Sequence, residues 1–197
     1  MAMAPLPKTT ALSNWHLADH TTSGKGQKSC QLSADHQRVS FQLGNKLRTR
    51  FGASSFDKSI APACKSIDFD ISDESELRAF LKSIDEWTVE YIFAHSARLF
   101  IKVMSKEVVA GHYKPLLHMY GESKSVRTKI NVSGHRVCDC WDAAKNLAEL
   151  PVDDWLSNTY DVQVSLLQLH LMGNDFGWVL ETTAMLRVHP IEGECPF

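Results

Sequence analysis

The sequence predicts an α+β fold, in which a mostly antiparallel sheet, open or closed into a barrel, has a long helix and a shorter helix inserted between its early and late strands. Two observations predict this class. Segments with alternating apolar residues, as in strands, lie on both sides of the chain's middle, at 38–50, 66–71, 123–141 and 160–188. Between them, residues 73–120 carry apolar side chains largely at helical spacing.

The chain is long enough for one domain with a substantial core. It has 197 residues, of which 44% are hydrophobic. We expect a mobile tail over 1–35, which has few apolar side chains, a domain over 36–190 and a short tail over 191–197. Five cysteines at scattered positions indicate a reducing, intracellular setting. Since no run of about 18 apolar residues occurs, we expect no membrane contact.

The first two strands carry opposite charges. Alternation predicts a strand over 38–43 that ends at a turn formed by Gly44 and Asn45. An extended segment then places three cations on one side, which suits either an edge strand protected from pairing or contacts to phosphates: Lys46, Arg48 and Arg50. The strand over 66–71 is predicted to have an acidic outer face.

The helices come next. Asp73 is predicted to cap a helix whose apolar positions continue to Leu99, and core packing is the expected role of Trp87 on its apolar side. A shorter helix opens at Ser105. Pro115 limits it, so we expect a turn or a short helical segment over 112–120.

The late part of the chain predicts two hairpins. A strand over 123–132 pairs with 137–141, followed by an ambiguous segment over 143–155, and the long hairpin over 160–188 turns at 173–175. Gly177 marks a bulge or a close approach of another backbone. The strand over 123–132 has a basic outer face with Arg127 and Lys129; Lys124 lies near its start, and Arg136 follows the turn. This order of elements fits an oligonucleotide-binding (OB)-like barrel.

No catalytic constellation is present. The sequence lacks a P-loop, a nucleophile elbow and a zinc-binding helix motif. His170 is more simply a hydrogen-bonded core residue than a general base. Cys138 and Cys140 are spaced too closely for the usual zinc motif, so small strand residues are favoured over a metal site. We therefore expect no cofactor and no enzyme activity.

The cations and rings instead suggest a binding surface. The net charge is −2, so affinity for a polyanion has to come from charge placed locally, with the acids elsewhere. If the two cationic segments share a face, they form a groove for single-stranded nucleic acid, in which rings stack on bases. The candidate residues are Lys46, Arg48, Arg50, Phe51, Tyr120, Lys124, Arg127, Lys129, Arg136 and Trp178.

A family resemblance supports this interpretation. Short segments over roughly 38–188 resemble, in their order, the single-stranded DNA-binding proteins of large eukaryotic DNA viruses and related algal proteins. These segments are Phe51–Gly52, Phe56–Lys58, Ser66–Ile71, Phe80–Glu86, Ala94–Ser96, Ser105–Val109, Tyr113–Pro115, Val126–Ile130 and Phe176–Trp178.

The resemblance implies the OB fold of phage replication-type proteins, coating of exposed DNA strands in replication or repair, and a nuclear or viral-factory location. It also implies replication proteins as partners. The end of the chain, 191–197, departs from the phage pattern because it has no long acidic tail, so we do not expect recruitment of partners through such a tail.

Two alternatives stay open at this point. The same sheet and hairpin could serve a scaffolding protein as an interface to another chain, including a second copy in a homo-oligomer. A hydrolase or metal enzyme would require an acid, a base and a pocket to converge.

Overall fold

The computed structural model describes residues 9–23, 28–34, 38–55, 63–100, 102–150, 155–172 and 175–188. Its helices are a 3-10 helix (Thr9–Asn14), α1 (Ser75–Phe100) and α2 (Lys106–His112). Its strands are β1 (Trp15–Leu17), β2 (Thr21–Thr22), β3 (Lys28–Ala34), β4 (Val39–Ser54), β5 (Cys64–Asp70), β6 (Tyr113–Lys114), β7 (Leu117–Tyr120), β8 (Ser123–Asn131), β9 (Asp139–Trp141), β10 (Thr159–Met172) and β11 (Asp175–Val188).

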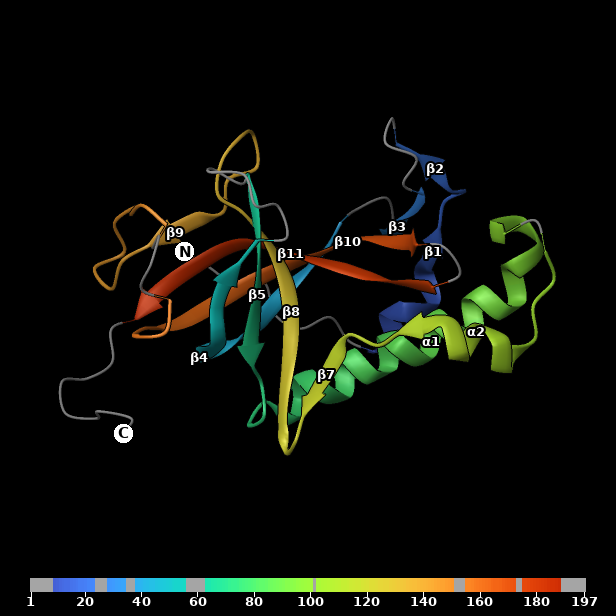
Figure 1. Cartoon of the computed structure of the whole chain (residues 1–197), viewed down its shortest axis with the longest axis horizontal. Coiled ribbons are helices and arrows are strands. Elements are labelled where there is room, and N and C mark those ends of the chain that lie inside the picture. Colours follow the sequence, from blue (N-terminus) through green and yellow to red (C-terminus); the bar gives the residue numbers. More distant parts are fainter. Residues whose placement is uncertain are drawn as a thin grey trace.

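Five strands pair in a closed cycle. β10 pairs with β4, β4 with β5, β5 with β8, β8 with β11, and β11 with β10. The pairings of β11 with β6, β8 and β9 are parallel, and the other pairings are antiparallel. The sheet is therefore mixed rather than a clean antiparallel barrel, and the α+β, OB-like prediction is confirmed at that level (Figure 1).

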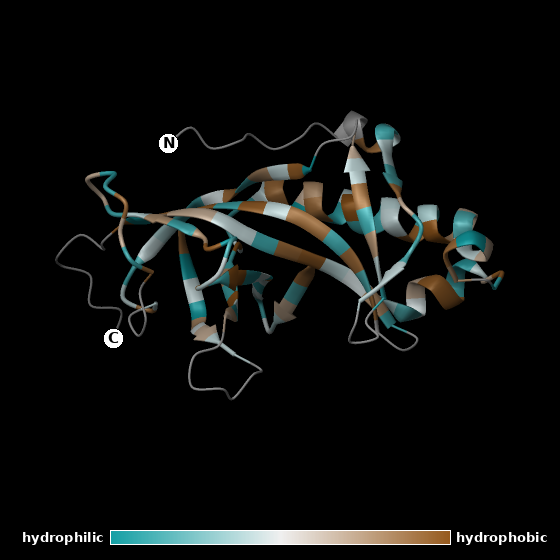
Figure 2. Ribbon diagram, turned by 90° about the horizontal axis from the view of Figure 1, so that it is seen from above, coloured by the Kyte–Doolittle hydropathy of each residue, from teal (hydrophilic) through white to brown (hydrophobic). Residues whose placement is uncertain are grey.

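The long hairpin of β10 and β11 is confirmed as the longest pairing, and its turn at 173–174 lies outside the described residues. Val162, Val164 and Leu166 alternate into the core, as the period of a strand requires. A register shift between Leu166 and Gln168 then changes the face, so Leu169 is also buried. Figure 2 shows the resulting bands of apolar and polar residues along the strands.

α1 covers one side of the sheet. It starts at Ser75, two residues after Asp73, and has a non-helical residue at His95. Its stripe of Phe80, Leu81 and Ile84 is buried, and the Phe80 ring lies edge-on to Phe41 of β4 with the centroids 5.2 Å apart. The predicted i, i+3, i+4 pattern thus corresponds to real packing.

The second helix is also confirmed. The Ser105 side chain accepts a hydrogen bond from the Val108 N–H and so caps α2. The prediction for 112–120 is wrong, because this segment forms the short strands β6 and β7. β6 adds to β11 and β7 adds to β8.

The predicted mobile tail is wrong for much of its length. The 3-10 helix and β1 to β3 lie within 9–34, and β3 extends the sheet beyond β10. Trp15 and Leu17 are buried, and the Trp15 ring lies edge-on to Trp87 of α1 at 5.7 Å. This contact also confirms the packing role expected for Trp87. A few apolar residues are enough to hold this segment on the domain, because burying each one stabilises the fold by about 1.5–3 kcal/mol.

Two strand boundaries differ from expectation. Gly44 and Asn45 do not end a strand, because β4 continues to Ser54 through a register shift against β10. Lys46 accommodates this irregularity with a φ of 51°. β4 is an interior strand, so the edge-strand explanation for its cations is wrong. β9 pairs with β11 in parallel rather than with β8 as a hairpin. Residues 191–197 lie outside the described residues.

Candidate nucleic-acid interface

An irregularity in β4 brings a ring to the surface. Thr49 of β4 pairs with Phe69 of β5, and Ala53 pairs with Ile67. Residues 50–52 of β4 therefore lie opposite one residue of β5, which is the arrangement of a β-bulge. Gly52 accommodates it with a φ of +68°, a conformation that most side chains disfavour. Phe51 is 62% exposed as a result.

Four side chains from three strands meet at this bulge, and we call them the ring–cation cluster: Arg50, Phe51, Tyr120 and Arg127. The Arg50 guanidinium carbon lies 4.9 Å from the centroid of the Tyr120 ring and 5.5 Å from that of Phe51. The two rings are edge-on at 5.8 Å. Arg127 donates a hydrogen bond of 3.2 Å from Nη2 to the Tyr120 hydroxyl. These distances suit cation–π attraction.

A buried carboxylate orients Arg127. Asp68 lies directly opposite Arg127 in the pairing of β5 with β8. Arg127 donates from Nη2 to Asp68 Oδ2 at 3.0 Å and from Nε to both carboxylate oxygens at 3.2 Å. The prediction that the acids lie away from the basic strands is therefore wrong for Asp68. Its side chain is 9% exposed, so this pairing fixes the guanidinium in place.

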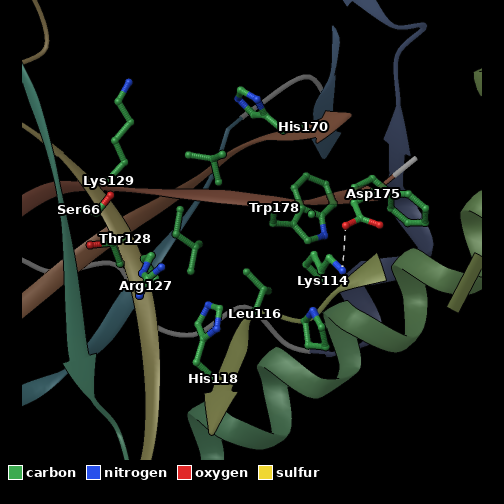
Figure 3. A pocket seen from close by; sticks show the side chains of 15 residues that line it. Ser66, Lys114, Leu116, His118, Arg127, Thr128, Lys129, His170, Asp175 and Trp178 are labelled. Atoms are coloured by element: carbon green, nitrogen blue, oxygen red, sulfur yellow. Dashed lines mark ion pairs between the residues drawn. The ribbon is translucent and has the colours of Figure 1, made fainter. Parts of the chain in front are cut away.

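A groove adjoins the cluster. It has a volume of about 390 Å³ and lies among β5, β8, β11 and the β6–β7 segment. Arg127, Thr128 and Lys129 of β8 line one side, and Trp178 lines the other (Figure 3). Arg127 belongs to both features, so the cluster and the groove are continuous.

Trp178 is tied to α1. Its indole Nε1 donates a hydrogen bond of 2.8 Å to Thr88 Oγ1, and the Thr88 hydroxyl donates to the Ile84 carbonyl at 2.6 Å. The indole is only partly exposed and packs against the core. Its orientation is therefore fixed by the helix rather than by the strand alone.

Gly177 makes the close approach that its sequence context predicted. It pairs with Lys114 of β6, and a Cβ at this position would lie 3.3 Å from the Lys114 carbonyl oxygen. Lys114 Nζ in turn contacts Asp175 Oδ2 at 2.9 Å, and His112 Nδ1 lies 3.2 Å from Asp175 Oδ1. Hydrogen bonds from Lys114 and His112 lower the pKa of Asp175. The ion pair between Lys114 and Asp175 holds β6 against the start of β11.

Two histidines line the groove. Burial lowers the pKa of His118, and the nearby Arg127 charge lowers it further. Burial also lowers the pKa of His170, with a smaller contribution from Lys129. The ring Nε2 of His170 lies 2.6 Å from Gln168 Nε2, as expected for a hydrogen-bonded residue. Both imidazoles are therefore mainly neutral at pH 7 and present polar atoms to the groove.

Among the described residues, no ring contact or ion pair joins the remaining candidates to the ring–cation cluster. Lys46 and Arg48 are exposed on β4, but among the described residues neither has an ion pair or ring contact. The backbone N–H of Lys124 donates to Ser72 Oγ. Arg136 Nη1 lies 3.8 Å from Oε2 of Glu181, whose side chain is only 4% exposed, so this arginine partly neutralises a buried acid.

Several groove residues were not predicted. Lys114, Leu116 and His118 lie in the segment that was expected to be helical or a turn, and Ser66 and Thr128 looked like ordinary strand residues. With only four residues, Leu117–Tyr120 is too short for an alternating pattern to reveal a strand. Sequence alone therefore predicted three of the residues that line the groove, Arg127, Lys129 and Trp178, and missed the β6–β7 segment.

The described residues contain no cluster of three or more histidine, cysteine or acidic side chains suited to a metal. Cys138 and Cys140 are buried, and burial raises the pKa of both thiols, which disfavours the thiolate form that metals bind. In the described part of the chain, no helix combines the length and apolar character needed to cross a membrane.

The fold is of the type seen in a phage single-stranded DNA-binding protein. No family model and no curated protein match the sequence. Among solved structures, gp2.5 of bacteriophage T7, a single-stranded DNA-binding protein, matches with a TM-score of 0.52 and 13% identity, over 81% of this chain and 92% of the phage chain. At this identity the match establishes a shared fold.

A second phage protein gives a weaker match. The single-stranded DNA-binding protein of bacteriophage Enc34, in complex with single-stranded DNA, has a TM-score of 0.48 and 11% identity, over 88% of this chain and 96% of that chain. Another structure of the Enc34 protein has a TM-score of 0.47 and 12% identity, over 92% of this chain and 96% of that chain.

Proposed function

We propose that this protein binds single-stranded DNA without a strong sequence preference and catalyses no reaction. The ring–cation cluster supplies the contact surface. Phe51 is 62% exposed, and Arg50 lies within 5.5 Å of both ring centroids. An exposed ring beside a guanidinium group can stack on a base while the cation contacts the adjoining phosphate. This convergence of distant segments is the observation that carries the proposal.

The charge distribution is compatible with this function despite a net charge of −2. Arg127 is paired with Asp68, so the cluster's excess positive charge comes from Arg50. Lys129 adds a second cation on the same face of β8, two residues from Arg127. Lys46, Arg48, Lys124 and Arg136 stay predictions as phosphate contacts, and they would extend the path beyond the cluster.

The proposal includes a cellular setting. Exposed single strands arise in replication and repair, and a sequence-tolerant binder would coat them there, inside the cell. The fold shared with T7 gp2.5 supports this assignment, because that phage protein binds single-stranded DNA. Replication proteins as partners, self-association, and a nuclear or viral-factory location are further predictions of the family resemblance.

The direct test is an affinity titration with a fluorescent oligothymidine at several salt concentrations. We expect the logarithm of the association constant to fall by about 0.7 per decade of salt for each phosphate neutralised. A duplex of the same length should bind more weakly, since paired bases cannot stack on the rings. An affinity that does not respond to salt, or no binding at all, would contradict the proposal.

A further inference from the structure

The groove beside the ring–cation cluster has the size and lining of a small-molecule site. Its volume of about 390 Å³ falls within the usual range for ligand pockets, about 300–1,000 Å³. One part of the lining is apolar, with Leu116, Phe176, Trp178 and Leu180. Polar atoms come from Ser66, Thr128, His118 and His170 at its margins (Figure 3).

The aromatic wall is preorganised. The hydrogen bond from the indole of Trp178 to Thr88 fixes the ring edge at α1. The contact of Gly177 with Lys114 fixes the backbone next to it. The ring can therefore receive a flat apolar group without first losing side-chain freedom, which lowers the entropy cost of binding.

The cationic side has one lysine without an ionic partner. Arg127 pairs with Asp68, and Lys114 pairs with Asp175. Lys129 forms no ion pair with any residue that the structure describes. Its charge is thus the most available one in the groove for an added anion, and it lies on the side of β8, across from Trp178 (Figure 3).

We propose that the groove holds one nucleotide of the bound strand, with the base against Trp178 and the phosphate at Lys129, supported by Arg127. This inference rests on the proposed function and adds to it a defined subsite. An apolar wall opposite a cation matches the two parts of a nucleotide, whereas a purely electrostatic trough would not need the wall. The strand would then be anchored at one nucleotide in the groove and stack more loosely on Phe51 and Tyr120.

The test uses thymidine 5′-monophosphate as the probe, with tryptophan fluorescence of the full chain as the readout. We expect titration to quench the fluorescence, and Trp178→Phe to remove this quenching. Trp87→Phe is the matched control, because Trp87 of α1 packs against Trp15 and does not line the groove. Quenching that survives in Trp178→Phe would overturn the inference.

Two further probes separate the parts of the nucleotide. Lys129→Gln should weaken binding of the monophosphate by about tenfold and leave binding of thymidine nearly unchanged, since only the phosphate contacts the lysine. Lys82→Gln, on the exposed face of α1, is the control for loss of one positive charge. Inorganic phosphate should compete with the monophosphate only weakly. Equal effects of the two lysine variants would overturn the placement of the phosphate.

The outcomes also distinguish this inference from the proposed function. If oligothymidine binds and the monophosphate neither quenches nor competes with it, the subsite is wrong and single-strand binding stands. If neither ligand binds, both fail. Binding of the monophosphate without binding of the oligonucleotide would also overturn both, because the groove would then serve a free nucleotide. Circular dichroism melting of each variant establishes that a loss of binding is not a loss of folding.

Discussion

The ring–cation cluster and the groove both combine rings with cations, but they hold the rings differently. Phe51 stands 62% exposed at a bulge, with Arg50 and Tyr120 as its neighbours. Trp178 is partly buried and has its N–H bonded to α1. An exposed ring suits stacking on any base of a bound DNA strand, whereas a fixed ring at a cavity wall suits one enclosed nucleotide.

The two features also depend on different parts of the fold. Strands β4, β7 and β8 carry the cluster, and β5 supplies Asp68, which orients Arg127. The groove wall around Trp178 and β6 is connected to α1, because Thr88 accepts from Trp178 and Asp85 accepts from the Tyr113 hydroxyl at 2.5 Å and from the Leu116 N–H at 3.2 Å. Changes at Asp85 and Thr88 of α1 should therefore affect the groove and leave the cluster intact.

The largest expected effect comes from removing both exposed rings. Each base stacked on a ring contributes about 1–3 kcal/mol, so Phe51→Ala with Tyr120→Ala should weaken oligothymidine binding by roughly 30-fold or more. Fluorescence anisotropy at fixed salt measures this. Phe93→Ala is the matched control, since Phe93 is a 43% exposed ring on α1. A double variant that binds as tightly as the control would remove the cluster from the interface.

The next effect concerns the α1 side alone and depends on pH. Burial raises the pKa of Asp85 from 3.8 to about 6 in the folded protein, although its hydrogen bonds with Tyr113 and Leu116 oppose the shift. Between pH 3.8 and about 6, the Asp85 carboxyl is therefore mainly protonated in the folded state and mainly ionised in the unfolded state. Stability contributed by the neutral carboxyl falls as pH rises from 3.8 to about 6, by at most about 3 kcal/mol.

Asp85→Asn isolates this contribution. The asparagine Oδ1 can still accept from Tyr113 and Leu116, but it does not titrate. Urea unfolding at pH 4.5 and pH 7 should show that the wild type loses more stability across this interval than the variant does. The comparison has to be a difference, because carboxylates with a lowered pKa, such as Asp175, contribute the opposite slope. Parallel pH profiles for the two proteins would show that Asp85 does not titrate as described.

A smaller effect tests the attachment of Trp178. Thr88→Val keeps the side-chain shape and removes the acceptor for the indole N–H, which should lower the free energy of unfolding by about 1–3 kcal/mol. Thymidine monophosphate should bind more weakly to this variant, while the contribution of Phe51 to oligothymidine binding should not change. If the loss were equal for both ligands, α1 would support the whole interface and the contrast between the two features would fail.

The sequence predicted the parts of this site that depend on local pattern. Alternation in Ser123–Asn131 placed Arg127 and Lys129 on one face, and a cation next to Phe51 suggested stacking. It could not predict that Asp68 would lie opposite Arg127, because the register of β5 against β8 is set by pairing between distant segments. The same limit explains why the acids were expected to lie elsewhere.

The N-terminal region shows a second limit. Composition predicted a tail over 1–35, yet Trp15, Leu17 and Cys30 are buried. A strand that adds to an existing sheet gains hydrogen bonds and a prepared apolar surface, so it needs few apolar residues of its own. Likewise β6 contains only Tyr113 and Lys114, too short to leave an alternating pattern, although it forms part of the groove.

The smallest effect distinguishes two cations of the same strand. Arg50 lies beside the rings, whereas Arg48, two residues earlier, has no ring contact among the described residues. If Arg50 contacts a phosphate, Arg50→Gln should lower the salt slope of oligothymidine binding by about 0.7, the value for one phosphate on a single strand. Arg48→Gln should change the slope less. An equal decrease in the salt slope for both variants would mean that the bound DNA follows β4 toward Lys46. Proximity to the rings would then not determine which cations contact phosphates.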